Sequence, residues 1–149
     1  MQPQKIVHSE TLRPPLWLLA FIFFLLGSLA LSIWAAFDNR SGLIALILAL
    51  VALPLINHAM LMRICVSETE LRVGRAHIER RYLGPAYVLT IDQMHLTRGR
   101  DADPAAYLAL RFWQPRGVRI EINDPRDSTP YWLISSKNAK GLVEALKTT

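Results

Sequence analysis

The chain has 149 residues, of which 52% are hydrophobic and 19% are charged, and its formal net charge is +5. A soluble domain of this size usually carries about 25% charged residues, and here the shortage is confined to the first part of the chain. Of the 17 basic and 12 acidic residues, residues 1–62 hold three and two, which leaves 14 and 10 for the other 87 residues. This distribution excludes a soluble single domain and a disordered chain, and a single cysteine, Cys65, excludes an intrachain disulfide scaffold.

Two long apolar runs account for the shortage of charge. The first, Leu16–Phe37, has 22 residues and no ionisable side chain; as a helix it is about 33 Å long, enough for a hydrocarbon core of roughly 30 Å. The second covers Gly42–Met62, and only residues 38–41 separate the two. A signal peptide has a shorter apolar core, and 87 residues are too few to cover two such helices as a soluble core. The sequence therefore predicts a transmembrane helical hairpin over residues 16–62, after an N-terminal segment of residues 1–15.

Basic residues flank the two runs on the sides away from the short loop. Lys5 and Arg13 precede the first run, whereas the loop holds only Arg40, opposed by Asp38. Five arginines follow the second run: Arg63, Arg72, Arg75, Arg80 and Arg81. Because lysine and arginine concentrate on the cytoplasmic side of membrane helices, we expect both termini in the cytoplasm and the loop outside.

The same five arginines are candidate contacts for anionic lipid headgroups, which attract such residues by about 1 kcal/mol each. The alternative is that they only set the topology. Nucleic acid is not expected as a partner, because Glu68, Glu70 and Glu79 interrupt the cluster and no base-stacking motif accompanies it.

Small and polar residues inside the runs suggest how the helices pack. Ser28, Ser32 and Ala36 recur every fourth residue on the first helix, and Ala45 and Ala49 do so on the second, with Ala52 near the same stripe. Such stripes let helix backbones approach in lipid, either within the hairpin or between two copies of it. Asn57 and His58 are polar groups inside the second run, but their distance from Arg63 places them near the cytoplasmic interface, where water satisfies them.

Residues 63–149 change to short alternating segments separated by turn signals. Strands are predicted at 63–66, 70–73, 76–82, 86–91, 106–113, 118–123 and 131–135. Apolar residues spaced i, i+3, i+4 and i+7 from Ala139 predict a C-terminal amphipathic helix. The predicted domain is thus small, α+β and mostly antiparallel. Its order of elements is that of a pleckstrin-homology-like barrel, and a plain antiparallel sheet with a helix on one face fits the pattern nearly as well.

An aromatic set is the candidate binding patch of this domain. On the predicted strand 106–113, Tyr107, Arg111 and Trp113 share the face opposite Leu108, Leu110 and Phe112, and Tyr131 and Trp132 follow on a later strand. If both faces of the sheet are covered, these side chains belong to the core. If one face is open, an arginine flanked by aromatic rings is a patch for a protein or a lipid.

Residue types needed for catalysis are scattered. Cys65 has no histidine beside it, and Asp92 and His95, three residues apart, are expected on opposite faces of a strand. No recognised metal-ligand spacing and no glycine-rich phosphate loop is present in the sequence. We therefore expect a non-enzymatic protein with no cofactor.

Several motifs identify a relative. These motifs are Asp103–Tyr107, Arg111–Trp113, Asp124–Pro125 and Thr129–Leu133, with "ETELRVGRAHI" just after the second run. With them the chain resembles an actinobacterial family of small two-span membrane proteins, domain of unknown function 3093. Glu10, Leu12 and Trp17 loosely match its opening segment, in which the tyrosine usual for the family is not evident here. The resemblance covers nearly the whole chain and implies a bacterial inner-membrane protein with a cytoplasmic domain, without a known activity or ligand.

The sequence leaves two candidate functions open. The first is a membrane-anchored binding or scaffolding module, such as an accessory subunit of a membrane complex. The second is a component that handles lipid or a small solute near Asn57 and His58; because two helices enclose no pathway, it requires a homo-oligomer or a membrane-protein partner.

Overall fold

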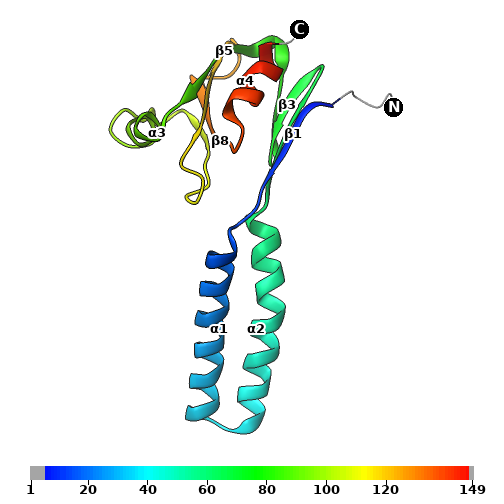
Figure 1. Cartoon of the computed structure of the whole chain (residues 1–149), viewed down its shortest axis with the longest axis vertical. Helices are drawn as coiled ribbons and strands as arrows, with labels where there is room; N and C mark the ends of the chain where they lie inside the picture. Colours follow the sequence, from blue (N-terminus) through cyan, green and yellow to red (C-terminus); the bar gives the residue numbers. More distant parts are fainter. Residues whose placement is uncertain (1–5, 148–149) are drawn as a thin grey trace. The chain divides into compact units, whose positions relative to one another are not determined.

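The computed structural model describes residues 6–147 of the chain (Figure 1). They form two compact units. The β domain combines the residues up to Leu12 with those from Met62 onward, and the helical hairpin comprises Arg13–Leu61. Lys5, which counts toward the predicted topology, lies outside the described residues.

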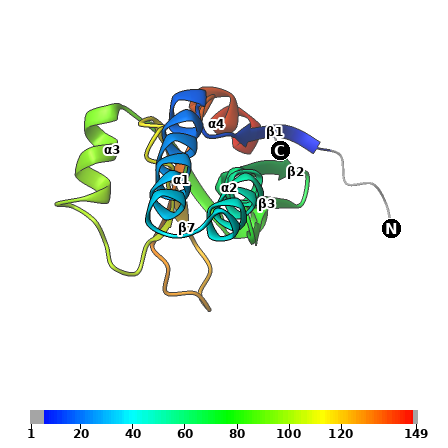
Figure 2. The same ribbon diagram turned by 90° about the horizontal axis from the view of Figure 1, so that it is seen from below.

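Two antiparallel helices make up the hairpin. Helix α1 spans Leu16–Ala36 and α2 spans Asn39–Met60, and Figure 2 looks along them. The predicted hairpin is confirmed, but α2 begins three residues earlier and ends two residues earlier than the apolar run suggested. Its start is fixed by Asp38, whose carboxylate accepts a hydrogen bond from the Ser41 N–H at 3.0 Å and caps the helix.

The helices contact each other along alanines of α2 and one buried alanine of α1, Ala30. Packing of the α1 stripe within the hairpin is wrong: Ser28, Ser32 and Ala36 are all exposed, and the Ser32 hydroxyl donates to the Ser28 carbonyl within its own helix at 2.8 Å. The alternative, contact of this stripe with a second copy, stays a prediction. The four-residue spacing places these residues on one face but does not say which face meets α2. That choice depends on the larger side chains around them.

The hairpin tip is closed by a tryptophan packed on a glycine. The indole of Trp34 lies over Gly42, where a Cβ atom would come within 2.5 Å of the ring, and its N–H donates to Asn39 Oδ1 at 2.9 Å. Gly42 is buried, although most of the hairpin is exposed. A side chain at position 42 would therefore push the indole off and separate the helices at the tip.

We expect Gly42→Leu to reduce crosslinking between cysteines placed at Ile33 and Ala45, which both line the helix interface. The measurement is the yield with a short bis-maleimide, in a Cys65→Ser background. Gly27→Leu is the matched control, because no atom lies within 4 Å of a Cβ added there. Equal yields in both variants would contradict the role of the Trp34–Gly42 contact.

The first sheet of the β domain has the order β1-β2-β3-β4 and is antiparallel throughout. Strand β1 spans Ile6–Leu12, β2 Met62–Ser67, β3 Glu70–Val73 and β4 Ala76–Glu79. The N-terminal segment is therefore not a separate unit: β1 pairs with β2, with Leu12 opposite Met62 and Ile6 opposite Ser67. The sequence analysis missed β1 because its partner strand follows only after the whole hairpin.

The second sheet has the order β5-β7-β8-β6, with β6 parallel to β8 and the other pairs antiparallel. Strand β5 spans Leu83–Leu89, β6 Tyr107–Ala109, β7 Gly117–Ile122 and β8 Tyr131–Ser135. A short 3₁₀ helix, η1 (Arg80–Tyr82), links the two sheets. The gap between the predicted strands 76–82 and 86–91 lies inside β5, and the strand predicted at 106–113 is only three residues long.

Helix α3 (Ile91–Arg98) was not predicted, and it begins at the last residue of the predicted strand 86–91. Thr90 and Gln93 form a reciprocal capping box: Gln93 N–H donates to the Thr90 hydroxyl at 3.3 Å, and Thr90 N–H donates to Gln93 Oε1 at 2.9 Å. The T-x-x-Q spacing that signals this cap is present in the sequence. Asp92 and His95 therefore lie three apart on a helix, which places them on neighbouring positions rather than on opposite faces of a strand.

The main core lies between the two sheets and the C-terminal helix α4 (Ala139–Lys147), which the sequence predicted correctly. Leu142 and Val143 of α4 are buried against residues of both sheets, such as Ile64, Val66 and Ile120. A smaller cluster beneath α3 joins Met94, Tyr131 and Leu133 on the other face of the second sheet. That sheet is thus covered on both faces where β8 lies.

Candidate functional sites

Two members of the predicted aromatic patch are core residues. Trp132 is 6% exposed in the main core and packs against Tyr107, with 4.7 Å between ring centroids and the ring planes tilted by 47°. Tyr131 is 3% exposed and points to the other face, where its hydroxyl accepts the Asp103 N–H at 3.1 Å and the Arg119 guanidinium lies 4.1 Å from its ring centre. Of the two alternatives left open by the sequence, burial favours the core for these residues.

Arg111 and Trp113 lie instead on a loop, residues 110–116, which we call the aromatic loop. Phe112 at its centre is 64% exposed, and its ring meets that of Trp113 edge-on at 4.9 Å. The Arg111 guanidinium lies 5.9 Å from the centre of the Trp113 ring. The alternation predicted for a strand does not apply here, because the chain leaves the sheet after Ala109.

Hydrogen bonds fix the aromatic loop to the end of β8. Arg111 N–H donates to the Ser135 hydroxyl at 3.0 Å, and that hydroxyl donates to the Gln114 carbonyl at 3.2 Å. The Gln114 side-chain amide donates to the Ser136 carbonyl at 2.9 Å, and Ser136 N–H donates to the Arg116 carbonyl at 3.1 Å. The loop is therefore held in one shape while Phe112 stays exposed.

The five predicted headgroup arginines separate into two groups along β2. We define the connecting end of the β domain by the pair Leu12–Met62, next to which the chain enters and leaves the hairpin, and the far end by the pair Ile6–Ser67. Arg63 and Arg75 are both exposed. They lie together at the connecting end, because the Gly74 N–H in the β3–β4 turn donates to the Arg63 carbonyl at 2.8 Å.

The other three arginines are engaged elsewhere. Arg72 pairs with Glu70 on its own strand at 2.9 Å, and Arg81 pairs with Glu79 at 2.8 Å. Arg80 is half-buried at the far end and donates to three carbonyl oxygens: Ser67 at 3.0 Å, and Ala145 and Leu146 at 2.9 Å each. Arg80 thus caps the C-terminus of α4 and ties it to β2. Spacing in the sequence did not reveal this role, since Ala145 lies 65 residues away.

The remaining candidate residues form no joint site. Asn57 is half-buried and His58 exposed on α2. His95 accepts a hydrogen bond from Arg98 at 2.8 Å, and the Cys65 sulfur lies 3.6 Å from the Ser9 hydroxyl. Within residues 6–147, no group of three or more histidine, cysteine, aspartate and glutamate side chains gathers as a metal site requires.

A polar cluster at the far end surrounds Tyr82. The Arg126 guanidinium donates to the Tyr82 hydroxyl at 2.8 Å, and its Nε donates to Asp124 at 3.3 Å. The Arg126 backbone N–H also donates to Asp124 at 3.0 Å. The backbone hydrogen bond, which has the larger effect, and the hydrogen bond from the guanidinium both lower the pKa of Asp124 below its ordinary value of 3.8.

This lowered pKa predicts acid sensitivity of the β7–β8 loop. A carboxyl group with a depressed folded-state pKa stabilises the folded state above its unfolded pKa, and the contribution disappears as the pH falls through the folded value. We expect the stability advantage of the native chain over Asp124→Asn to be constant at neutral pH and to shrink as the pH falls below 3.8. Thermal unfolding of both chains across this range checks it; an advantage that persists in strong acid would contradict it.

Comparison with known proteins identifies a family. The model of the family described as "Protein of unknown function (DUF3093)" matches residues 7–146, which is nearly the whole chain. The chain belongs to the DUF3093 family. The matched region includes β1 from Val7, both helices of the hairpin and the rest of the β domain up to Leu146. Neither a curated protein nor a solved structure matches the chain. Membership of DUF3093 therefore confirms the predicted resemblance and leaves the function to be argued from the structure.

Proposed function

We propose that the protein is a non-enzymatic, membrane-anchored binding module of a bacterial inner membrane, with the hairpin as its anchor and the β domain in the cytoplasm. The supporting observation is the exposure of the hairpin. Large apolar side chains point outward along both helices, including Phe24 at 67%, Leu31 at 69% and Leu48 at 63% exposed. The core helix of a soluble protein would bury such side chains, whereas a lipid-facing helix presents them.

The lengths of the helices agree with this role. α1 has 21 residues and α2 has 22, and each is long and apolar enough to cross a membrane. Positive charge at the connecting end, with Arg63 and Arg75 exposed, favours placing that end on the cytoplasmic side. The hairpin tip, which carries Asp38 and Arg40, would then lie outside.

The β domain would carry the binding function. Its two four-stranded sheets are linked by η1 and pack against α4. The pleckstrin-homology-like arrangement suggested by the sequence stays a prediction, and the parallel pair β6–β8 departs from an all-antiparallel barrel. The proposed role of this domain is attachment of a partner protein at the membrane, as an accessory subunit.

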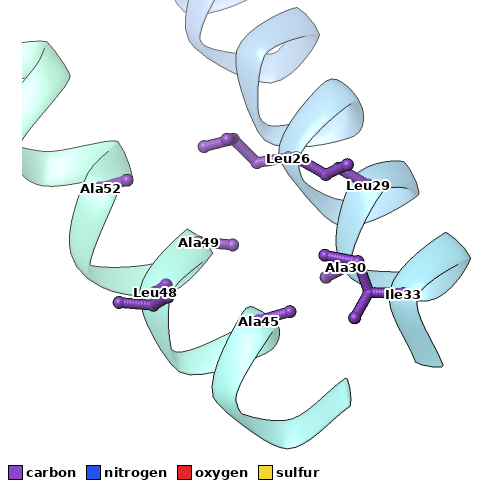
Figure 3. A pocket seen from close by; sticks show the side chains of 8 residues that line it. All are labelled: Leu26, Leu29, Ala30, Ile33, Ala45, Leu48, Ala49 and Ala52. Atoms are coloured by element: carbon purple, nitrogen blue, oxygen red, sulfur yellow. The ribbon is translucent and has the colours of Figure 1, made fainter. Parts of the chain in front are cut away.

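The alternative, a lipid- or solute-handling component, gains one observation. A groove of about 200 Å³ lies between the helices and is lined only by leucine, isoleucine and alanine (Figure 3). These residues are Leu26, Leu29, Ala30, Ile33, Ala45, Leu48, Ala49 and Ala52. Because Asn57 and His58 do not line it, the groove suits an acyl chain better than a polar solute, and a solute pathway would require a further copy or partner.

Cysteine labelling in intact cells tests the anchor and its topology. In a Cys65→Ser background, Arg40→Cys at the hairpin tip is expected to react with a membrane-impermeant maleimide from outside. Lys137→Cys, exposed on the β domain, is the control and is expected to react only after lysis. Labelling of position 137 in intact cells, or extraction of the protein by alkaline carbonate, would overturn the proposal.

Crosslinking in cells tests the binding role. The tagged full chain is crosslinked, solubilised in mild detergent and purified, and its bound proteins and lipids are identified by mass spectrometry. A protein partner recovered in constant ratio supports an accessory subunit. Enrichment of acyl lipids with no protein would favour the lipid-handling alternative instead.

A further inference from the structure

An exposed aromatic side chain lies at the same end of the β domain as the connections to the hairpin. Glu10, two residues before the end of β1, accepts a hydrogen bond from the Asn138 N–H at 3.2 Å. Asn138 lies two residues after Ser136 in the chain. Gln114 and Arg116 of the aromatic loop are hydrogen-bonded to Ser136. This chain of contacts places residues 110–116 at the connecting end, and Figure 1 shows the loop, in yellow, on that side of the β domain.

The far end is occupied by other loops. The C-terminus of α4 lies at this end, because Arg80 links it to Ser67 by hydrogen bonds. The β7–β8 loop also lies at this end, because Asn123 N–H donates to the Tyr82 carbonyl at 2.8 Å. Strand β7 runs six residues from Gly117 to Ile122, about 20 Å. The aromatic loop before it and the acidic β7–β8 loop after it are therefore at opposite ends of the domain.

The chemistry of the connecting end matches that of a membrane surface. Phe112 is 64% exposed, and Val88 and Ile91, at 43% and 40%, border a shallow hollow with Arg116. Arg63, Arg75 and Arg116 are exposed around these apolar side chains. The acids at this end are Asp92, beside Arg116 in the hollow, and Glu10, which is bonded to Asn138. Positive charge thus exceeds negative charge where apolar side chains are exposed.

We propose that the aromatic loop docks on the inner leaflet of the membrane that the hairpin crosses. Phe112 enters the boundary between headgroups and acyl chains, and the guanidinium groups of Arg116, Arg63 and Arg75 contact lipid phosphates. This inference rests on the proposed function, because the connecting end meets the membrane only if the hairpin spans it. It names the lipid surface, rather than a second protein, as the occupant of this end. Leu12 and Met62 directly adjoin the hairpin in the sequence, so the chain tethers this end to the surface of the bilayer that the hairpin crosses.

Spin-label accessibility in the full chain tests the docking. The protein, in a Cys65→Ser background, is reconstituted in nanodiscs of phosphatidylcholine and phosphatidylglycerol, and single labels are placed at Pro115→Cys, Asp127→Cys and Leu25→Cys. We expect the label at 115 to be shielded from a water-soluble nickel chelate and accessible to oxygen, as a label in the interface is. The label at 127, in the far-end loop, is expected to be fully accessible to the chelate.

Further variants separate lipid docking from simple burial. Phe112→Asp is expected to make the label at 115 as accessible to the chelate as the one at 127, and Phe112→Leu to preserve most of the shielding. If 115 equals 127 in the native loop while the label at 25 lies in the bilayer, the docking is wrong and the anchor stands. If the label at 25 is also accessible to the chelate, the membrane anchor itself is wrong.

Discussion

Replacing Arg80 with alanine is expected to lower the free energy of unfolding of the β domain by about 2–3 kcal/mol. The guanidinium donates to three backbone carbonyls, two of them at the C-terminus of α4 and one on β2. Hydrogen bonds from a charged donor are worth about 1.5–3 kcal/mol each, and partly buried carbonyls left without a donor add a desolvation cost. Because α4 covers the main core, its release at one end exposes apolar residues of both sheets.

Thermal unfolding of the full chain in detergent, followed by tryptophan fluorescence, measures this effect. For a domain of this size, 2–3 kcal/mol corresponds to a decrease in Tm of about 10 °C or more. Arg81→Ala is the matched control: its guanidinium is 64% exposed and pairs with an exposed Glu79, so its loss is expected to cost no more than about 1 kcal/mol. Similar decreases for both variants would contradict the capping role of Arg80.

Trp132→Ala is expected to cost about 3–5 kcal/mol, the range for removing a large aromatic side chain from a packed core. The indole is 6% exposed and contacts Tyr107 between the two sheets. A natural domain has about 5–15 kcal/mol of total stability, so this variant should accumulate at a much lower level in cells and unfold at a lower temperature. Trp132→Phe keeps most of the packing and is expected to lose less.

Phe112→Ala provides the opposite case on the aromatic loop. Because Phe112 is 64% exposed, its truncation is expected to change the free energy of unfolding by less than about 0.5 kcal/mol. The two variants together distinguish the members of the predicted patch that build the core from the one that is free to bind. Normal abundance of Trp132→Ala with loss of a bound partner would show instead that Trp132 belongs to a binding surface.

Local patterns were sufficient for several elements. Strands β3 and β8 were predicted with their observed bounds, and β7 and α4 within a residue or two, because each combines clean alternation or helical spacing with turn residues at its ends. The length and composition of the apolar runs predicted the helices of the hairpin. Helix α3 was missed although Thr90 and Gln93 signal its cap, since the short apolar stretch before it was taken as a continuous strand.

The functional residues depended on contacts that no local pattern records. Five arginines looked equivalent in the sequence, yet Arg63 and Arg75 are exposed at the connecting end while Arg80 caps a helix 65 residues away. The aromatic residues near Arg111 looked like one patch, and they divide into core and loop because β6 ends at Ala109.

By itself, the sequence determined the two-helix hairpin, the mostly antiparallel character of the β domain, the C-terminal helix and the resemblance to DUF3093, because these follow from composition, periodicity and motifs that act over a few residues. The tertiary structure alone decided that residues 6–12 pair with β2 across the hairpin, that Ser28 and Ser32 face away from α2, and that Phe112 stays exposed. These outcomes depend on which distant segments pack together, and such packing is set by the sum of many weak contacts that no single stretch of sequence contains.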